Sequence, residues 1–147
     1  MLQCLVLQIS KTYFLRLNYI EKNTFQYNKD MVMKFTAVIP VKAHSSRLPG
    51  KNLKPFGKEN LLTRKIRQLK QSQIADRIIL SSDSDEMLDI ATKHGIEAIK
   101  RPIEFANESR PFGEFLDYIS EIIKEGHMIY SCVTSPFFDE NLMVKAK

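Results

Sequence analysis

The segment from Val38 to Leu53 carries three cations spaced among small residues, which is a pattern suited to binding phosphate. The cations are Lys42, Arg47 and Lys51, and the small residues between them are Ala43, Ser45, Ser46 and Gly50. Small residues let backbone N–H groups approach phosphate oxygens, and cations offset the charge of a polyphosphate. Transfer of a nucleotidyl group needs positioning and positive charge from the protein, and this segment offers both.

The same residues are also compatible with a solvated surface loop. Charged side chains are mostly exposed, and Pro49-Gly50 is a common turn pair. Charge spacing alone favours this surface loop over a phosphate site. The two interpretations stay open at the level of composition and spacing.

The elements around this segment alternate in the manner of a βαβ protein. Short apolar runs predict strands over 35–40, 77–82, 96–99 and 127–133, and amphipathic runs predict helices over 61–72 and 83–94, one that opens at Pro111 and ends at Gly126, and one from near Asp139. This rhythm predicts an α/β fold with three α/β/α layers and a Rossmann-like, mainly parallel sheet. Loops at the carboxyl ends of such strands converge, so we expect the loops after Pro40, Ser82 and Val133 to meet.

Side-chain periodicity predicts which face each helix buries. In helix 61–72 the apolar residues point to the sheet, and we expect the cations Arg64, Lys65, Arg67 and Lys70 on the opposite face. In the helix after Pro111 we expect Phe112 and Phe115 to belong to the core.

Four motifs resemble a known family. Residues 39–52, with Ile-Pro at the start and Leu-Pro-Gly-Lys-Asn at the end, resemble the signature of cytidylyltransferases that activate acidic sugars, the CMP-sialic acid (acylneuraminate) and CMP-Kdo synthetases. The strand and Ser82-Asp83 that follow it are similar to the family's strand with Ser-Thr-Asp, Arg101-Pro102 matches an Arg-Pro pair, and residues 134–136 resemble its Thr-Ser-Pro-Leu-Arg element. Together the motifs cover nearly all of residues 35–138.

The resemblance implies a reaction and a fold. CTP and an acidic, sialic-acid-like sugar would give a CMP-sugar and pyrophosphate, with Mg²⁺ as cofactor, in the cytoplasm and for surface polysaccharide or lipopolysaccharide precursors. The fold would be of the nucleotide-diphospho-sugar transferase type, and full-length members form homodimers. The Lys51-Asn52 pair leans toward the sialic acid group rather than the Kdo group.

The resemblance also implies residue roles. Lys42, Arg47 and Lys51 would act on the phosphates as catalytic residues, with Lys42 standing where the family has Arg. Nucleotide contacts would come from Ser45, Asn52, Ser82, Asp83 and Arg101, with Ser82 and Asp83 on the cytidine side.

The chain departs from the family pattern in two places. Cys132 and Val133 stand before Thr134 in place of the family's usual residues, and Phe137-Phe138 replace Leu-Arg. Family members also continue to a dimerisation and sugar-binding region and to a metal-binding Asp motif. We therefore expect a member that is incomplete at its C-terminus, with no metal ligands in this chain, weak binding of CTP and little turnover.

Length and composition set the remaining expectations. The chain has 147 residues, a net charge of +5 and two cysteines without metal-site spacing, which indicates one globular domain and an anionic partner. Residues 33–147 form the predicted domain, and residues 1–32 are expected to be an extension before a natural start at Met33. No signal peptide or membrane span is predicted. A basic nucleic-acid-binding domain that uses the cations of helix 61–72 is the alternative, although no RNA- or DNA-reading motif is present.

Overall fold

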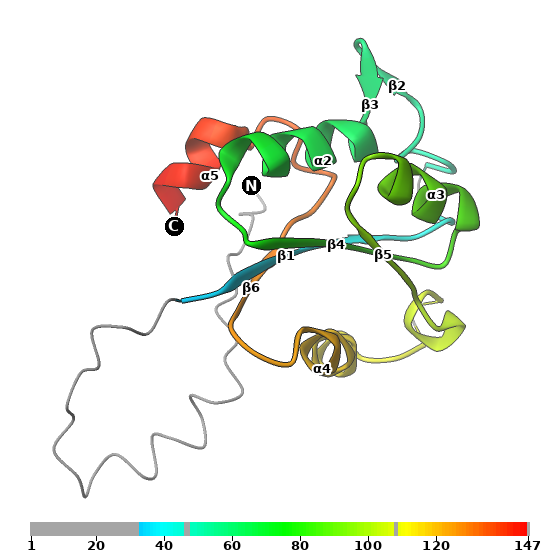
Figure 1. Cartoon of the computed structure of the whole chain (residues 1–147). Coiled ribbons are helices and arrows are strands. Elements are labelled where there is room, and N and C mark those ends of the chain that lie inside the picture. The colour runs from blue at the N-terminus through cyan, green and yellow to red at the C-terminus, as the bar shows by residue number, and fades with distance from the viewer. Residues whose placement is uncertain (1–32, 46–47, 108, 147) are drawn as a thin grey trace, which may run out of the picture.

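Four parallel strands form the central sheet of the protein (Figure 1). The computed structural model describes residues 33–45, 48–107 and 109–146, and the predicted extension over 1–32 lies outside them. The strands are β1 (Phe35–Val41), β4 (Arg77–Ser82), β5 (Glu97–Lys100) and β6 (His127–Tyr130), in the order β5-β4-β1-β6. All three strand pairs are parallel. The predicted parallel sheet is thus confirmed.

Helices cover both faces of this sheet. Helices α2 (Leu61–Ser72), α3 (Asp85–Lys93) and α5 (Glu140–Ala146) lie on one side, and α4 (Phe112–Ile123) lies on the other (Figure 1). A short hairpin, β2 (Pro55–Phe56) and β3 (Glu59–Asn60), precedes α2, and the 3-10 turn η1 (Ile103–Phe105) follows β5. The three-layer α/β/α architecture is therefore as predicted.

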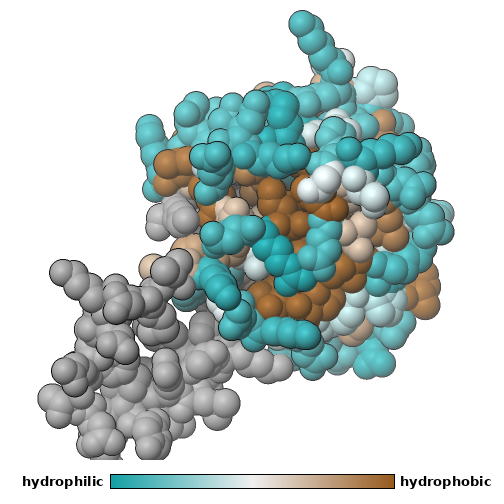
Figure 2. Space-filling model, viewed as in Figure 1, coloured by the Kyte–Doolittle hydropathy of each residue, from teal (hydrophilic) through white to brown (hydrophobic). Residues whose placement is uncertain are grey.

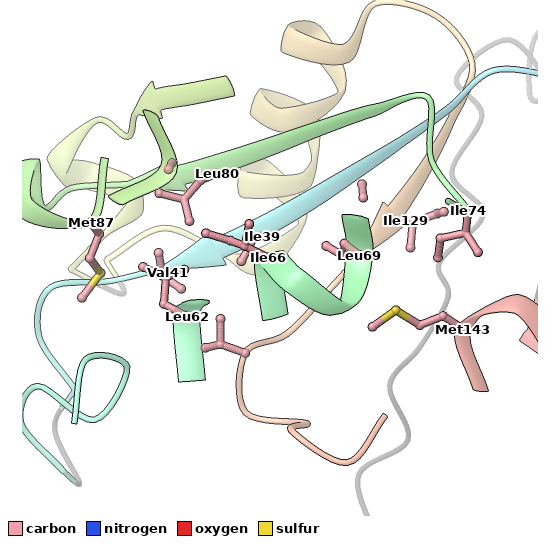
Figure 3. Packing of buried hydrophobic residues seen from close by; sticks show 13 residues of the cluster. Ile39, Val41, Leu62, Ile66, Leu69, Ile74, Leu80, Met87, Ile129 and Met143 are labelled. Atoms are coloured by element: carbon pink, nitrogen blue, oxygen red, sulfur yellow. The ribbon is translucent and has the colours of Figure 1, made fainter. Parts of the chain in front are cut away.

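The alternation of β1 divides the core into two clusters. Ala37, Ile39 and Val41 are at most 2% exposed and pack with α2 and α3, as Figure 3 shows for Ile39 and Val41 beside Leu62 and Ile66. Val38 points to the opposite face, where it packs with buried residues of α4. Successive strand side chains alternate between faces, so β1 is apolar throughout because both of its faces are buried.

Local chemistry fixes the ends of the helices. Asn60 and Thr63 form a reciprocal capping box at the start of α2, and Ser84 accepts a hydrogen bond from the backbone of Met87 at the start of α3. Because Ser84 is the cap, α3 begins at Asp85 and not at Asp83. Asp139 accepts a hydrogen bond from the backbone of Leu142 and so begins α5, close to the predicted place.

Two strand ends differ from the sequence prediction. β1 continues through Pro40 to Val41, because β6 pairs with β1 only as far as Val38 and the nitrogen of Pro40 faces that unpaired side. β6 ends at Tyr130 and not at Val133. The Ser131 N–H makes a last bond to the Val38 carbonyl, after which the chain turns away from the sheet.

Helix α4 also differs from its prediction. It ends at Ile123, followed by Lys124 with φ of +67°, so Gly126 lies beyond its end. Gly126 instead allows β6 to approach the residue before β1, because a Cβ there would lie 2.6 Å from the Lys34 carbonyl oxygen. Phe115 is buried as predicted, but Phe112 is 54% exposed. Phe112 lies at the first position of the helix, where its ring is tilted against that of Phe115 and makes an edge contact with that of Tyr130.

The molecular surface, viewed from the same side as in Figure 1, is mostly hydrophilic over the helices (Figure 2). Figure 2 shows a hydrophobic area between the upper helices and the layer of α4. None of the helices in the described part of the chain combines the length and the apolar character that a membrane span requires.

Candidate active site

A cavity of about 390 Å³ opens at the carboxyl edge of β1 and β6. It is lined by polar residues of the loop after β1, by the residue after β5 and by the loop after β6: Lys42, His44, Ser45, Lys51, Asn52, Arg101, Tyr130, Cys132 and Thr134, with Pro40, Val41 and Val133. Ligands of open parallel α/β sheets bind at this edge. Two of the three loops that were expected to converge therefore line one cavity.

The loop after β1 is closed by the amide of Asn52. Its Nδ2 donates to the carbonyl oxygen of Lys42 at 3.3 Å, which joins the beginning of the loop to its end. Gly50, with φ of +65°, forms the turn and accepts hydrogen bonds from the N–H groups of Leu53 and Lys54. Asn52 is only 5% exposed, and its Oδ1 has no hydrogen-bond partner among the described residues. The buried amide thus shapes the loop and leaves an acceptor available beside the cavity.

The predicted phosphate ligands Lys42, Ser45 and Lys51 all lie on the wall of this cavity. Arg47 lies outside the described residues, so its predicted role stays a prediction. The lining contains ammonium, hydroxyl and amide groups and no carboxylate among the described residues. Such a lining suits an anionic ligand that also offers hydrogen-bond donors and acceptors.

Arg101 adds a buried cation to the same wall. The residue is 5% exposed, and its guanidinium donates from Nη2 to the Ser81 carbonyl at 2.8 Å and from Nε to the Ser81 hydroxyl at 3.3 Å. The Phe115 ring lies beneath the guanidinium, 4.6 Å away. Burial lowers the pKa of Arg101, partly offset by the nearby Tyr130 and Asp83. A desolvated guanidinium held by a neutral serine favours an incoming anion.

Ser82 and Asp83 lie beside the cavity and not on its wall. Ser82 is fully buried, and its hydroxyl accepts a hydrogen bond from the backbone of Ser84 at the start of α3. The Asp83 Oδ1 accepts a hydrogen bond from the backbone of Ala43 at 2.8 Å, in the loop after β1. The loop after β4 therefore reaches the site by supporting the phosphate loop, and the predicted contacts of Ser82 and Asp83 with cytidine stay predictions.

The prediction that Lys65 faces solvent is wrong. Lys65 is 1% exposed, and its Nζ donates to the carbonyl oxygens of Ser135 and Phe138 in the loop after β6. Its position explains this burial, since Leu62, Lys65, Ile66 and Leu69 follow one another at the spacing of a single helical face. The spacing of this face predicts a buried side chain at position 65, whereas the charge of Lys65 alone predicts an exposed one.

The other cations of α2 are engaged within the protein. Arg64 and Arg67 both contact the carboxylate of Glu59, and Lys70 donates to the carbonyl of His94. Hydrogen bonds from Arg67, and then from Arg64, lower the pKa of Glu59. A basic helix face whose charges are used internally is a poor candidate for a nucleic-acid surface, which weakens that alternative.

A larger cavity, of about 720 Å³, lies elsewhere, between the β2–β3 hairpin and α2. Its wall includes Lys58, Glu59, Arg67 and His94. It lies along α2, away from the carboxyl edge of the sheet. Among the described residues of the segment 38–53, Leu53 alone lines it. We therefore place the site in the smaller cavity.

Magnesium was expected from the family resemblance. Across residues 33–45, 48–107 and 109–146, no group of three or more His, Cys, Asp or Glu residues could hold a metal ion. Mg²⁺ prefers carboxylate and phosphate oxygens in an octahedral array. The described residues therefore do not fit a magnesium site by themselves.

A parallel α/β sheet with a cation-lined cavity at its carboxyl edge is an arrangement typical of nucleotide-binding α/β proteins. Comparison of sequences gives the family: residues 36–146 match the cytidylyltransferase family, and the chain belongs to it.

Individual proteins agree with this assignment. Pseudaminic acid cytidylyltransferase of Campylobacter jejuni is 29% identical over 120 residues, which cover 78% of this chain and 52% of the relative. CMP-N,N'-diacetyllegionaminic acid synthase of Legionella pneumophila is 38% identical over 63 residues, which cover 43% of this chain and 27% of the relative. The solved structure of CMP:2-keto-3-deoxy-manno-octonic acid synthetase with CTP is 19% identical, with a TM-score of 0.64 over 76% of this chain and 45% of that one, and so has the same fold. The chain spans about half the length of the pseudaminic acid relative.

Proposed function

We propose that this chain contributes the nucleotide-binding part of an enzyme that transfers CMP from CTP to an acidic, sialic-acid-like sugar and releases pyrophosphate. The observation that carries the proposal is the cavity at the carboxyl edge. Lys42, Lys51 and Arg101 line it, and none of the described residues on its wall is a carboxylate. The relatives add support, because one is named pseudaminic acid cytidylyltransferase and another CMP-N,N'-diacetyllegionaminic acid synthase, and both names refer to acidic sugars.

The proposed reaction needs no protein nucleophile. A hydroxyl oxygen of the sugar forms a bond to the α-phosphorus of CTP, the bond from that phosphorus to the bridging oxygen breaks, and the hydroxyl proton passes to solvent. Charge accumulates on the leaving pyrophosphate, where the ammonium groups of Lys42 and Lys51 would stabilise it. The protein's main contributions are alignment and positive charge.

The remaining residues of the site would orient the nucleotide. Ser45 offers a hydroxyl, and the Asn52 Oδ1 is a buried acceptor that a ligand N–H or O–H would satisfy. Arg101 is a desolvated cation held beside the same space. Together these groups offer positive charge and hydrogen-bonding partners, both of which a nucleoside triphosphate requires.

Calorimetric titration with CTP and with cytidine tests the proposal. We expect CTP to bind more tightly than cytidine, and Lys51→Met to weaken CTP binding about tenfold while leaving cytidine unchanged, since one charge-assisted contact is lost. Lys54→Met is the matched control, because Lys54 lies in the same loop, is exposed and does not line the cavity. Equal affinities of wild type and Lys51→Met for CTP would refute the proposed phosphate contact.

The acceptor sugar and the magnesium ion are the finer parts of the proposal. Release of pyrophosphate should be compared with N-acetylneuraminic acid, pseudaminic acid and Kdo as acceptors, with and without Mg²⁺. We expect slow turnover, with the sialic-acid-like sugars preferred and magnesium required, some of whose ligands the phosphates would supply. Preference for Kdo would move the chain to the other group of the family. Because CTP is a metabolite of the cytoplasm, we place the reaction there.

A further inference from the structure

Three side chains of α2 hold the loop after β6 by its backbone. Arg64 Nε and Gln68 Nε2 both donate to the carbonyl oxygen of Pro136, each at 3.0 Å. Lys65 Nζ donates to the carbonyl of Ser135 at 3.0 Å and to that of Phe138 at 3.2 Å. We name this set of four hydrogen bonds the α2 clamp. It joins residues 64–68 of the helix to the backbone carbonyls of residues 135, 136 and 138 in the loop after β6.

Two members of the α2 clamp are buried to a degree that is unusual for polar side chains. Lys65 is 1% exposed and Gln68 is 0% exposed. The Gln68 Oε1 has no hydrogen-bond partner among the described residues, while its Nε2 is bonded to Pro136. Turning the amide over would place Oε1 against the Pro136 carbonyl, so the loop determines its orientation. Burial of these groups carries a desolvation cost, which their hydrogen bonds to the loop help to offset.

The clamped loop is also a wall of the candidate active site. Cys132, Val133 and Thr134 line the cavity, and the Ser135 N–H donates to the Cys132 carbonyl at 3.4 Å, which links the wall to the clamped residues. The beginning of α2 is tied to the opposite wall, because the Leu62 N–H donates to the Asn52 carbonyl at 3.1 Å. One helix therefore connects both walls and sets their separation.

Lys65 also contacts a side chain of the clamped loop. Its Nζ lies 6.0 Å from the centre of the Phe138 ring, which is within the range of a cation–π contact.

We propose that Lys65, with Gln68, is a positioning residue of the nucleotide site: it fixes the loop of Cys132–Thr134 against the phosphate loop without touching the nucleotide. The expected effect on CTP binding rests on the proposed function, whereas the contacts of the α2 clamp do not. A measurement on the loop tests the clamp, and a measurement of CTP affinity tests its effect on the nucleotide site.

Cys132 supplies the measurement on the loop. The chain has two cysteines, so in a Cys4→Ser background the reaction with Ellman's reagent reports on the half-buried Cys132 alone. Lys65→Met removes the ammonium group and keeps an unbranched apolar chain as long as the stem of lysine. We expect it to raise the rate of Cys132 modification about fivefold through local opening, and to weaken CTP binding about tenfold. Lys70→Met is the control, because Lys70 also donates to a carbonyl from α2 but is exposed and far from the loop.

The possible outcomes distinguish the α2 clamp, the positioning role of Lys65 and the proposed function. If Lys65→Met remains folded by circular dichroism and changes neither the Cys132 rate nor CTP affinity, the proposal is wrong. A faster Cys132 reaction with unchanged CTP affinity would make the α2 clamp structural only and would also overturn the positioning role. If the wild type binds no CTP, the proposed function fails while the Cys132 rate still tests the clamp. Should Lys65→Met not fold, Gln68→Met, which removes only the bond to Pro136, takes its place with the same expected directions.

Discussion

The Asp83 carboxylate and the backbone N–H of Ala43 form a hydrogen bond of 2.8 Å between two loops that are 40 residues apart. Ala43 lies in the loop that we propose for the phosphates, and Asp83 follows β4, the strand that pairs with β1. The bond directs a backbone group of the phosphate loop toward β4. An acidic residue thereby supports a site for an anion without lining it.

Asp83→Ala is expected to loosen the phosphate loop. Loss of a charge-assisted hydrogen bond should weaken CTP binding by about 1.5 kcal/mol, or about tenfold. Asp83→Asn keeps an acceptor oxygen at the same place and should retain most of the affinity. Calorimetric titration of both variants with CTP checks this. Equal loss in the two variants would point to the carboxylate charge, and no loss in either would exclude the support that we describe.

Arg101→Met is expected to separate stability from binding. The guanidinium is buried and bonded to Ser81, not to a carboxylate, so its replacement by an apolar chain should change the free energy of unfolding by no more than about 1 kcal/mol. CTP affinity should fall at least about tenfold, because a desolvated cation is lost. Urea unfolding and CTP titration of the same preparation give the two values. A large loss of stability with unchanged affinity would show that Arg101 serves the fold alone.

Gly126→Ala is expected to destabilise the sheet at the start of β1 and β6. The added Cβ would lie 2.6 Å from the Lys34 carbonyl oxygen, and the φ of +91° is strained for alanine, so we expect a loss of about 2 kcal/mol. Gly113→Ala is the control, since no atom lies within 4 Å of its added Cβ, and Gly113 is in α4, where alanine favours the helix. Thermal unfolding should show opposite shifts. A Gly126→Ala variant as stable as the wild type would contradict the close approach.

The pair of Arg64 and Arg67 on Glu59 predicts a pH dependence. These contacts lower the pKa of Glu59 from its usual 4.5, so the carboxylate stabilises the folded state above that pH, and the contribution disappears as the pH falls through the lowered value. The side chains are partly exposed, so the contribution is below about 1 kcal/mol. Glu59→Gln should therefore be less stable than wild type at pH 7, and the difference should shrink as the pH falls below 4.5. If the difference in stability between the two proteins persisted at acidic pH, it would come from packing and not from the charge of Glu59.

Much of the fold could be predicted from the sequence, because periodicity is a local property. The bounds of α2 and β4 were predicted to the residue, and both faces of β1 are apolar as a central strand requires. The end of β1 was missed because it depends on which neighbour faces Pro40, and that is a property of sheet order. The exposure of Phe112 depends on where α4 begins relative to Tyr130. A local sequence pattern does not give the relative position of these two segments.

The residues that line the site could be predicted from the sequence, but the contacts that hold its loops in place could not. Lys42, Ser45, Lys51, Asn52 and Arg101 all reach one cavity, since loops at the carboxyl ends of parallel strands must converge. The tether from Asp83 and the contacts of Lys65 join segments distant in the chain, and both use backbone groups as partners. A backbone carbonyl has no sequence signature, so such contacts appear only in the folded structure.

Amide NMR during a CTP titration tests most directly whether CTP binds in the cavity at the carboxyl edge of the sheet. We expect the largest shifts at Ala43, Lys51, Asn52 and Thr134, and little change at the hairpin of Lys58 and Glu59. Shifts confined to the cavity between that hairpin and α2, with the phosphate loop unchanged, would contradict the account.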